Sequence, residues 1–370
     1  MSARVRFYHG ESGAYLGSPT TDDLGTVEVS FDLHGSNVAR VEIPRCSAFS
    51  QMDQHAPDGL GAFVEVDAQS LGVPDIWLGA IPTTQLGGEL PSRVLDATGP
   101  ALYLDEVPTG PVRETGQPAA TIVRNAVQAA RRSPWIASVT ASSEELGRTA
   151  PYGTSATTLW KLATDLETAR WEAFYITPRG GGVESDLHWM TLHGGQDFSG
   201  EVTLIAGRNC IPQPTAYGLR PKLAESLLVG QSFGLGSDVM ASQVTAPDGA
   251  RPMGIHDALT LALSTRQVRK LAGDHASEVL PDLDQTAQEG LDLVAEATMR
   301  RAMIPRLLQQ VEVTDCALWP YLRPHSLLRV QLDDDGGVFA DAVARVRTVQ
   351  FRVAPTLACT ISVDLWRMIG

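Results

Sequence analysis

The chain has 370 residues, of which 43% are hydrophobic and 19% are charged, a composition that excludes an intrinsically disordered protein. Its 29 basic and 43 acidic residues give a formal net charge of −14, which argues against stable binding to nucleic acid or to an anionic membrane surface. The sequence has neither a long apolar run nor an N-terminal signal sequence, so we expect no membrane span and no secretion by a leader.

The first 113 residues have the pattern of β structure. Hydrophobic and polar residues alternate in three runs, at 27–33, 39–43 and 62–67. Such alternation predicts strands with one face buried and the other face turned to water or to a partner. In the first run the second face consists of Glu28, Ser30 and Asp32. Prolines and a glycine at 108–111 predict a linker at the end of this block.

Residues 114–200 have the pattern of a small α+β unit. Apolar spacing predicts helices over 118–132 and 155–169, and strands are predicted over 171–177 and 186–191. Pro118 is expected in the first turn of the first helix, and Arg131 and Arg132 are expected at its negative C-terminal end.

Residues 201–370 return to β structure around a helical excursion. Strands are predicted near 202–204 and 227–229 and over 328–332, 349–353 and 357–366, with a further strand that begins near Phe339. Helices are predicted over 255–271 and 284–303. Since the last alternating run ends four residues before the C-terminus, we expect no tail or appended domain.

The four cysteines are far apart in the sequence. They are Cys46, Cys210, Cys316 and Cys359. Because no Cys-x-x-Cys occurs, a zinc ribbon and a thioredoxin-type redox pair are disfavoured. We expect four buried or half-buried thiols.

Two segments resemble metal sites only superficially. Asp186, His188 and His193 are close in sequence, but a spacing of five in a strand and turn does not place both imidazoles on one face. Three consecutive aspartates followed by two glycines at 333–337 lack the alternate carboxylates and closing glutamate of a calcium loop, so a hairpin turn explains them better.

The remaining candidates for chemistry are weaker. The segment 9–13 departs from the nucleophile-elbow pattern, the glycine-rich segment 230–236 matches no phosphate-binding loop and is predicted to be a flexible loop, and the acidic pairs have the pattern of solvated surface. These pairs are Asp22-Asp23 and Glu144-Glu145. We therefore predict no catalytic, cofactor-binding or metal-ligating residue, no cofactor and no enzymatic activity.

The order of the blocks resembles the hub proteins of tailed-phage baseplates and tail tips, including the siphophage tail-associated hub and minor tail proteins. The resemblance covers nearly all 370 residues and depends on the order of short segments. These segments are 63–66, 77–81, 120–124, 158–162, 171–175, 187–189, 194–199, 319–330 and 345–346. Many siphophage hubs continue into a fibre or a peptidase domain, and this sequence does not show one.

The resemblance implies an α+β, mainly β fold with two tail-tube-like β-barrels. The implied domains are a first barrel at 1–113, an α+β insert at 114–200, a second barrel at 201–245 and 303–370, and a helical excursion at 246–302. It further implies a homotrimer whose six barrels join the six-fold tail tube to a three-fold tip and form part of the DNA-delivery channel.

The implied partners are other chains of the tail. They are further copies of this chain, the distal tail protein ring, the tape-measure protein and a separate tip spike or fibre protein. The implied location is the virion tail tip, with assembly in the host cytoplasm. A trimer would carry a formal charge of about −42, so we hypothesise an acidic lumen that repels DNA and binds no nucleic acid stably.

Two alternative functions remain open at the level of sequence. One is a hydrolase that acts on cell-wall polymer, which needs a convergent set of acid, base or nucleophile groups, with Asp186, His188 and His193 as its least implausible site. The other is a carbohydrate-binding β protein, which is compatible with the seven tryptophans, although helix packing explains Trp160.

Overall fold

The computed structural model describes most of the chain. The described residues are 3–44, 46–54, 60–82, 92–109, 112–114, 117–141, 152–154, 158–170, 172–191, 195–219, 226–232, 239–245, 306–332 and 339–368. The helices predicted over 255–271 and 284–303, the turn at 333–337, Glu144-Glu145 and His193 lie outside the described residues.

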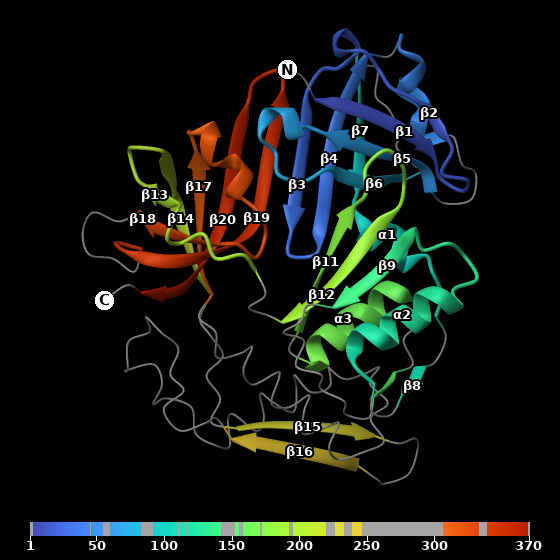
Figure 1. Ribbon diagram of the computed structural model, residues 1–370, viewed down its shortest axis with the longest axis vertical. Helices are drawn as coiled ribbons and strands as arrows, with labels where there is room; N and C mark the ends of the chain where they lie inside the picture. Colours follow the sequence, from blue (N-terminus) through green and yellow to red (C-terminus); the bar gives the residue numbers. More distant parts are fainter. Residues whose placement is uncertain are drawn as a thin grey trace.

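Most described strands belong to one long sheet. The N-terminal block supplies β1 (Arg4–His9), β2 (Tyr15–Gly17), β3 (Val27–Asp32), β4 (Gly35–Pro44), β5 (Leu60–Asp67), β6 (Trp77–Pro82) and β7 (Ser92–Thr98). The C-terminal block supplies β13 (Thr203–Ile205), β14 (Cys210–Leu219), β17 (Arg306–Val313), β18 (Leu327–Gln331), β19 (Ala342–Ala354) and β20 (Ala358–Met368). The main path runs β14-β17-β20-β19-β3-β4-β7-β6-β5-β1-β2 (Figure 1).

β3 and β19 join the two ends of the chain within this sheet. They pair antiparallel, with Phe31 opposite Val349 and Val29 opposite Phe351. The rings of Phe31 and Phe351 meet edge to face with their centroids 6.3 Å apart. The N-terminal and C-terminal β blocks therefore lie side by side (Figure 1).

The two β blocks share one hydrophobic core. Val27, Val29 and Phe31 are buried on β3, and they belong to the same cluster as Val349 and Phe351 on β19. The alternation at 27–33 and 39–43 thus gives the predicted strands with one buried face, because only alternate side chains reach this core.

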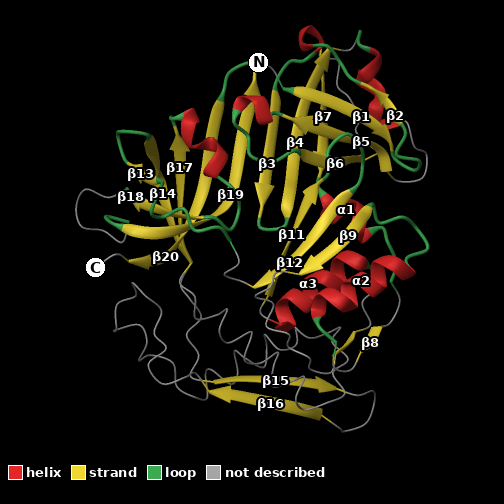
Figure 2. Cartoon of the chain, viewed as in Figure 1, coloured by secondary structure: helices red, strands yellow, loops and turns green. Residues whose placement is uncertain are grey.

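The middle of the chain forms a second layered unit on this sheet. It consists of α1 (Pro100–Asp105), α2 (Ala119–Ala129), β9 (Ile136–Ala141), α3 (Leu159–Arg170), β11 (Glu172–Pro178) and β12 (Ser185–Thr191). β12 pairs parallel with β9 and antiparallel with β11, and α2 and α3 lie against these strands (Figure 2). A small sheet of β8 (Val112–Glu114) and β10 (Tyr152–Thr154) accompanies them.

β5 and β6 are buried on both faces. Val64 and Val66 contribute to the core of the long sheet, whereas Phe63 and Leu78 contribute to a second core with α1, α2 and α3. The alternation at 62–67 had predicted one face turned to water or a partner. That prediction is wrong for Phe63 and Glu65, because the middle unit covers their face and leaves both residues 0% exposed.

The helices of the middle unit are confirmed with changed ends. Pro118 is the N-cap residue of α2 rather than part of its first turn, and Arg131 and Arg132 lie beyond its last turn. The two strands predicted at 171–177 and 186–191 correspond to β11 and β12. α1 was not predicted, because its six residues span too few turns for a periodic pattern, although Pro100 at its start follows the common preference of helices.

The mainly β, α+β class is confirmed, with two corrections. Among the described strands the main pairing path is open from β14 to β2, so these pairings do not close the expected barrels. Residues 230–232 lie in β15 (Ser226–Ser232), which pairs with β16 (Val239–Thr245), and not in a flexible loop. The domain boundaries drawn from the sequence stay a prediction. None of the helices in the described part of the chain is both long and apolar enough to cross a membrane.

Candidate functional site

The structure assigns the Asp186 and His188 side chains to hydrogen bonds between strands. Ser138 Oγ on β9 donates to Asp186 Oδ1 at 2.6 Å, and Thr140 Oγ1 lies 2.9 Å from His188 Nδ1. Arg179 Nη2 donates to Asp186 Oδ1 at 2.7 Å, and this hydrogen bond lowers the pKa of the Asp186 carboxyl. Within the described ranges no group of three or more His, Cys, Asp or Glu residues could hold a metal ion.

The segment 9–13 forms the turn of a hairpin. His9 Nδ1 accepts hydrogen bonds from the backbone N–H groups of Glu11 and Ser12, at 3.3 and 3.4 Å. The turn connects β1 to β2, whereas a nucleophile elbow connects a strand to a helix. Of the acidic pair Asp22-Asp23, Asp23 accepts a hydrogen bond from Thr20 Oγ1 at 2.9 Å in a capping box.

The cysteines divide into two kinds. All four are free thiols, and Cys210 and Cys359 are buried. Burial raises the pKa of both thiols, and it raises the pKa of Cys210 to about 11. Cys46 and Cys316 are exposed, so the expectation of four buried or half-buried thiols is wrong for these two. Cys46 precedes a short 3-10 helix and Cys316 begins another, in connecting segments where alternation gives no information on burial.

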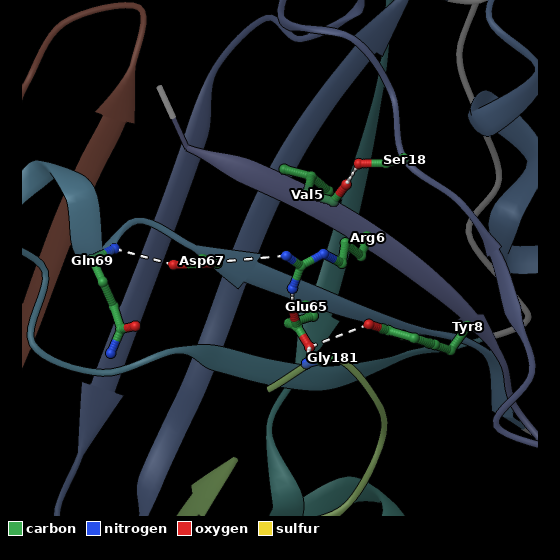
Figure 3. Close-up of polar contacts among 8 residues, drawn as sticks. All are labelled: Val5, Arg6, Tyr8, Ser18, Glu65, Asp67, Gln69 and Gly181. Carbon is green, nitrogen blue, oxygen red and sulfur yellow. Dashed lines mark hydrogen bonds and ion pairs between the residues drawn. The ribbon is translucent and has the colours of Figure 1, made fainter. Parts of the chain in front are cut away.

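One buried carboxylate joins the long sheet to the middle unit (Figure 3). Glu65 on β5 is 0% exposed and accepts hydrogen bonds from Arg6 Nη1 and from the Tyr8 hydroxyl, which lies at 3.3 Å. The backbone N–H of Gly181, in the turn between β11 and β12, donates to Glu65 Oε2 at 2.7 Å. Burial, and then the Glu65 charge, raise the pKa of Tyr8 to about 12, so its hydroxyl remains a donor.

A second contact between the blocks surrounds the turn from β3 to β4, and we call it the three-block joint. His34 in this turn bonds through Nε2 to Glu167 Oε2 of α3 at 2.9 Å, and its carbonyl accepts from the N–H of Ile176 on β11 at 3.0 Å. Gly35 has φ +113°, and a Cβ there would lie 2.3 Å from the carbonyl oxygen of Ile176. Only glycine therefore allows this close backbone approach.

His325 connects the C-terminal block to the same joint. Its Nε2 lies 2.6 Å from the carbonyl oxygen of Leu33, and its ring meets Tyr175 of β11 edge to face. The residue is 4% exposed, and among the described residues its Nδ1 has no hydrogen-bond partner. Burial lowers the pKa of His325 to about 4, so the imidazole is neutral at pH 7.

A third polar contact connects the loop before β6 to β11 and to the C-terminal block. Asp75 pairs with Arg323 Nη2 at 3.2 Å and accepts from the Tyr175 hydroxyl at 3.4 Å. Burial raises the pKa of Asp75, while the Arg323 charge opposes that effect. All three β-rich parts of the chain thus meet at hydrogen-bonded, largely buried groups, which fix their relative positions.

Four charged side chains form a row across the open face of the long sheet. Arg352, Glu28, Arg40 and Asp96 occupy directly paired positions on β19, β3, β4 and β7. Arg352 Nε donates to Glu28 Oε1 at 2.7 Å, and Arg40 Nε donates to Asp96 Oδ1 at 3.1 Å. We call these residues the paired-charge row, because each arginine faces a carboxylate.

The other two residues expected on the open face have local partners. Ser30 Oγ donates to the carbonyl of Val38 at 2.9 Å and also accepts from its N–H. Asp32 accepts from the backbone N–H of His34 at 2.8 Å inside the three-block joint, and burial raises its pKa.

The roles of Glu65, Arg6 and His325 were not predicted from the sequence. A glutamate inside the apolar run at 62–66 was the available signal for Glu65, since an ionisable residue among buried strand positions needs a partner. The partners themselves come from β1 and from the turn after β11, and no local pattern connects these segments. His325 gave no signal beyond its residue type.

Known proteins resemble the chain in fold. No family model matches the sequence, and no curated protein matches it. The solved structure of a 43 kDa tail protein of prophage MuSo2 from Shewanella oneidensis aligns with a TM-score of 0.55 and 13% identity, and the alignment covers 98% of both chains. A tail protein from Neisseria meningitidis MC58 aligns with a TM-score of 0.53 and 15% identity over 98% of this chain and 97% of that one.

A third structure comes from a secretion system. The E. coli c3393 protein is described as a component of the type VI secretion system with structural similarity to the T4 bacteriophage tail proteins gp27 and gp5. It aligns with a TM-score of 0.51 and 11% identity over 93% of this chain and 74% of that chain. The chain therefore has the fold of phage tail proteins, and the resemblance seen in the sequence is confirmed at the level of fold.

Proposed function

We propose that this chain is a structural, non-enzymatic protein of a phage tail or of a related tail-like injection particle. The observation that carries the proposal is the alignment over almost the full length of two tail proteins, which includes both β blocks and the middle unit. A fold alone can host several functions, so the proposal also depends on the surfaces described above.

The finer proposal is a homotrimeric hub at the tail tip. Each chain carries two β blocks side by side in one sheet, so three chains would present six such blocks around a three-fold axis. Contacts between unlike surfaces of successive chains close such a ring. This arrangement would adapt a six-fold tube to a three-fold tip, with the distal tail protein, the tape-measure protein and a separate spike or fibre as neighbours.

The open face of the long sheet is the proposed wall of the DNA channel. Bare arginines on a channel wall would bind phosphates and retain DNA. In the paired-charge row, Glu28 and Asp96 neutralise the two arginines, so the wall would present no unmatched cation there. We therefore propose a channel wall with matched charges in place of the simpler hypothesis of an acidic lumen. The net charge of −14 is a property of the whole chain and not of this sheet face.

The native mass of the purified chain tests the hub proposal. We expect a species near 119 kDa, three copies of the 39.7 kDa chain, at a protein concentration of about 20 µM, which exceeds a dissociation constant of about 1 µM. A chain that stays near 39.7 kDa at this concentration contradicts self-assembly into a hub.

A further inference from the structure

A hollow lies between the β1–β2 turn and the segment that follows α2. It has a volume of about 310 Å³ and is lined by Gly10, Glu11, Arg132, Ser133 and Trp135. This volume is at the lower end of the range for small-molecule sites. The lining residues do not belong to the joints between blocks or to the paired-charge row, so neither of those roles explains them.

The aromatic wall of the hollow has a strained backbone. Trp135 has φ 54°, which is uncommon for a bulky residue. Its carbonyl accepts from the N–H of Ser185 at 2.8 Å, and its N–H donates to Ser133 Oγ at 3.3 Å. Its ring meets Phe63 edge to face at 6.1 Å. These contacts fix a half-buried indole in place, and strain of this kind gathers at binding sites.

The polar side chains of the hollow are one acid, one base and the Ser133 hydroxyl, which already accepts from the N–H of Trp135. In the part of the chain that the structure describes, neither the Glu11 carboxylate nor the Arg132 guanidinium has an ion-pair partner. The carboxylate accepts hydrogen bonds and the guanidinium donates them. The hollow therefore offers both kinds of hydrogen bond, close to an aromatic surface and with no net charge.

We propose that this hollow binds a neutral sugar residue. The apolar face of a pyranose ring would lie on Trp135, and its hydroxyl groups would donate to Glu11 and accept from Arg132. A ligand with charge of one sign only would leave one of these two groups unmatched, and an apolar ligand would desolvate both without hydrogen bonds. A sugar carries donors, acceptors and an apolar face together, and its hydroxyl groups can both donate to the carboxylate and accept from the guanidinium.

The test uses the full chain labelled with 5-fluorotryptophan, whose seven tryptophans give separate ¹⁹F signals. Trp135→Phe assigns the signal of Trp135. Glucose, galactose and N-acetylglucosamine are titrated singly to about 20 mM, above the millimolar Kd of weak ligands. We expect at least one sugar to shift the Trp135 signal, with the signals of buried Trp77 and Trp319 unchanged.

Arg132→Ala and Arg131→Ala form the matched pair of variants. Arg132 lines the hollow, whereas its neighbour Arg131 is exposed and does not. Loss of a hydrogen bond to a charged group should weaken binding about ten-fold in Arg132→Ala and leave Arg131→Ala unchanged. The inference is overturned if none of the three sugars shifts Trp135, or if both variants bind equally. Neither result affects the proposed trimer, which is measured by mass.

Discussion

At the scale of single residues, buried polar groups hold the blocks of this chain together. Glu65, which no solvent reaches, bonds to groups from β1 and from the turn between β11 and β12. His325 bonds to the β3–β4 turn from the C-terminal block. Each of these residues is well placed to report on the contact between blocks, because its loss leaves partners unsatisfied in a buried site.

Replacement of Glu65 should strongly destabilise the fold. Glu65→Ala leaves Arg6 and Tyr8 without their shared acceptor, so we expect a loss of about 3 kcal/mol in the free energy of unfolding. Asp67→Ala is the control, since Asp67 lies 4.0 Å from Arg6, both side chains are partly exposed, and its other partner is the exposed N–H of Gln69 at 3.3 Å. It should cost under about 1 kcal/mol. Urea unfolding measures both, and equal losses would contradict the role of Glu65.

Acidification should weaken the three-block joint through His325. The unfolded histidine takes up a proton near its ordinary pKa of 6.5, whereas the folded one does so only near 4. Protons therefore favour the unfolded chain between these values. The contribution of His325 to stability should be fully present above pH 6.5, and roughly 3 kcal/mol should be lost as the pH falls from 6.5 to 4.

The variant His325→Asn isolates this contribution, because asparagine tolerates the residue's φ of 68° and does not titrate. Asp32 and Asp75, whose pKa values are raised by burial, act in the opposite direction in both proteins. Around the imidazole, the charges of Arg345 and His34 lower the pKa of His325 as burial does, whereas the Glu167 charge raises it, and these effects are lost with the imidazole in the variant. The difference in unfolding free energy between the two proteins should be smaller at pH 4.5 than at pH 7. An equal difference at both pH values would contradict the prediction.

At the scale of elements, periodicity predicted the strands and helices in which apolar side chains gather on one face. It located β3, β4, α2, α3, β11 and β12, because their apolar residues recur with a regular period. It also located β5, but the expected open face of this strand is wrong, because a second layer covers that face and buries Phe63 and Glu65. Contacts between distant segments decide whether a neighbouring unit covers a strand face, and local patterns carry no information on such contacts.

The β3–β4 turn should tolerate no side chain at Gly35. Gly35→Ala places a Cβ against the carbonyl of Ile176 at a positive φ, so we expect a loss of about 2–4 kcal/mol and faster proteolysis of the middle unit. Gly182→Ala is the control, because open space surrounds that position, and it should change stability by less than about 0.5 kcal/mol. Similar effects of both substitutions would show that the close approach at Gly35 is unimportant.

Removal of the two acids of the paired-charge row should create DNA affinity. In the double variant Glu28→Gln and Asp96→Asn, Arg352 and Arg40 lose their carboxylate partners, so we expect binding to duplex DNA at low salt that decreases steeply as salt rises. The control double variant Glu106→Gln and Glu201→Gln changes the net charge equally at exposed positions away from the row. Fluorescence anisotropy measures both variants, and equal binding would mean that net charge alone sets the affinity.

At the scale of the whole molecule, both ends of the chain contribute strands to one long sheet, and the middle unit lies against it. The order of blocks in the sequence indicated the family of tail proteins, and the structural alignments agree at the level of fold. The pairing of β3 with β19, and the shared core that follows from it, could not be predicted, since strand partners so far apart leave no periodic signal. The joint at Glu65 connects β1 and β5 to the turn between β11 and β12, and the joint at His325 connects the C-terminal block to the β3–β4 turn. Both were missed because no local pattern connects such distant segments.

Electron microscopy of the purified chain, at the concentration at which it assembles, decides whether three copies form a ring around a channel. We predict three-fold class averages of a ring with an open centre, whose wall is formed by the sheet face that carries Arg352, Glu28, Arg40 and Asp96. A gold label on Gln350→Cys, in a chain with Cys46 and Cys316 changed to serine, should then lie inside the ring. Particles without a central opening, or a label on the outer rim, would contradict the account.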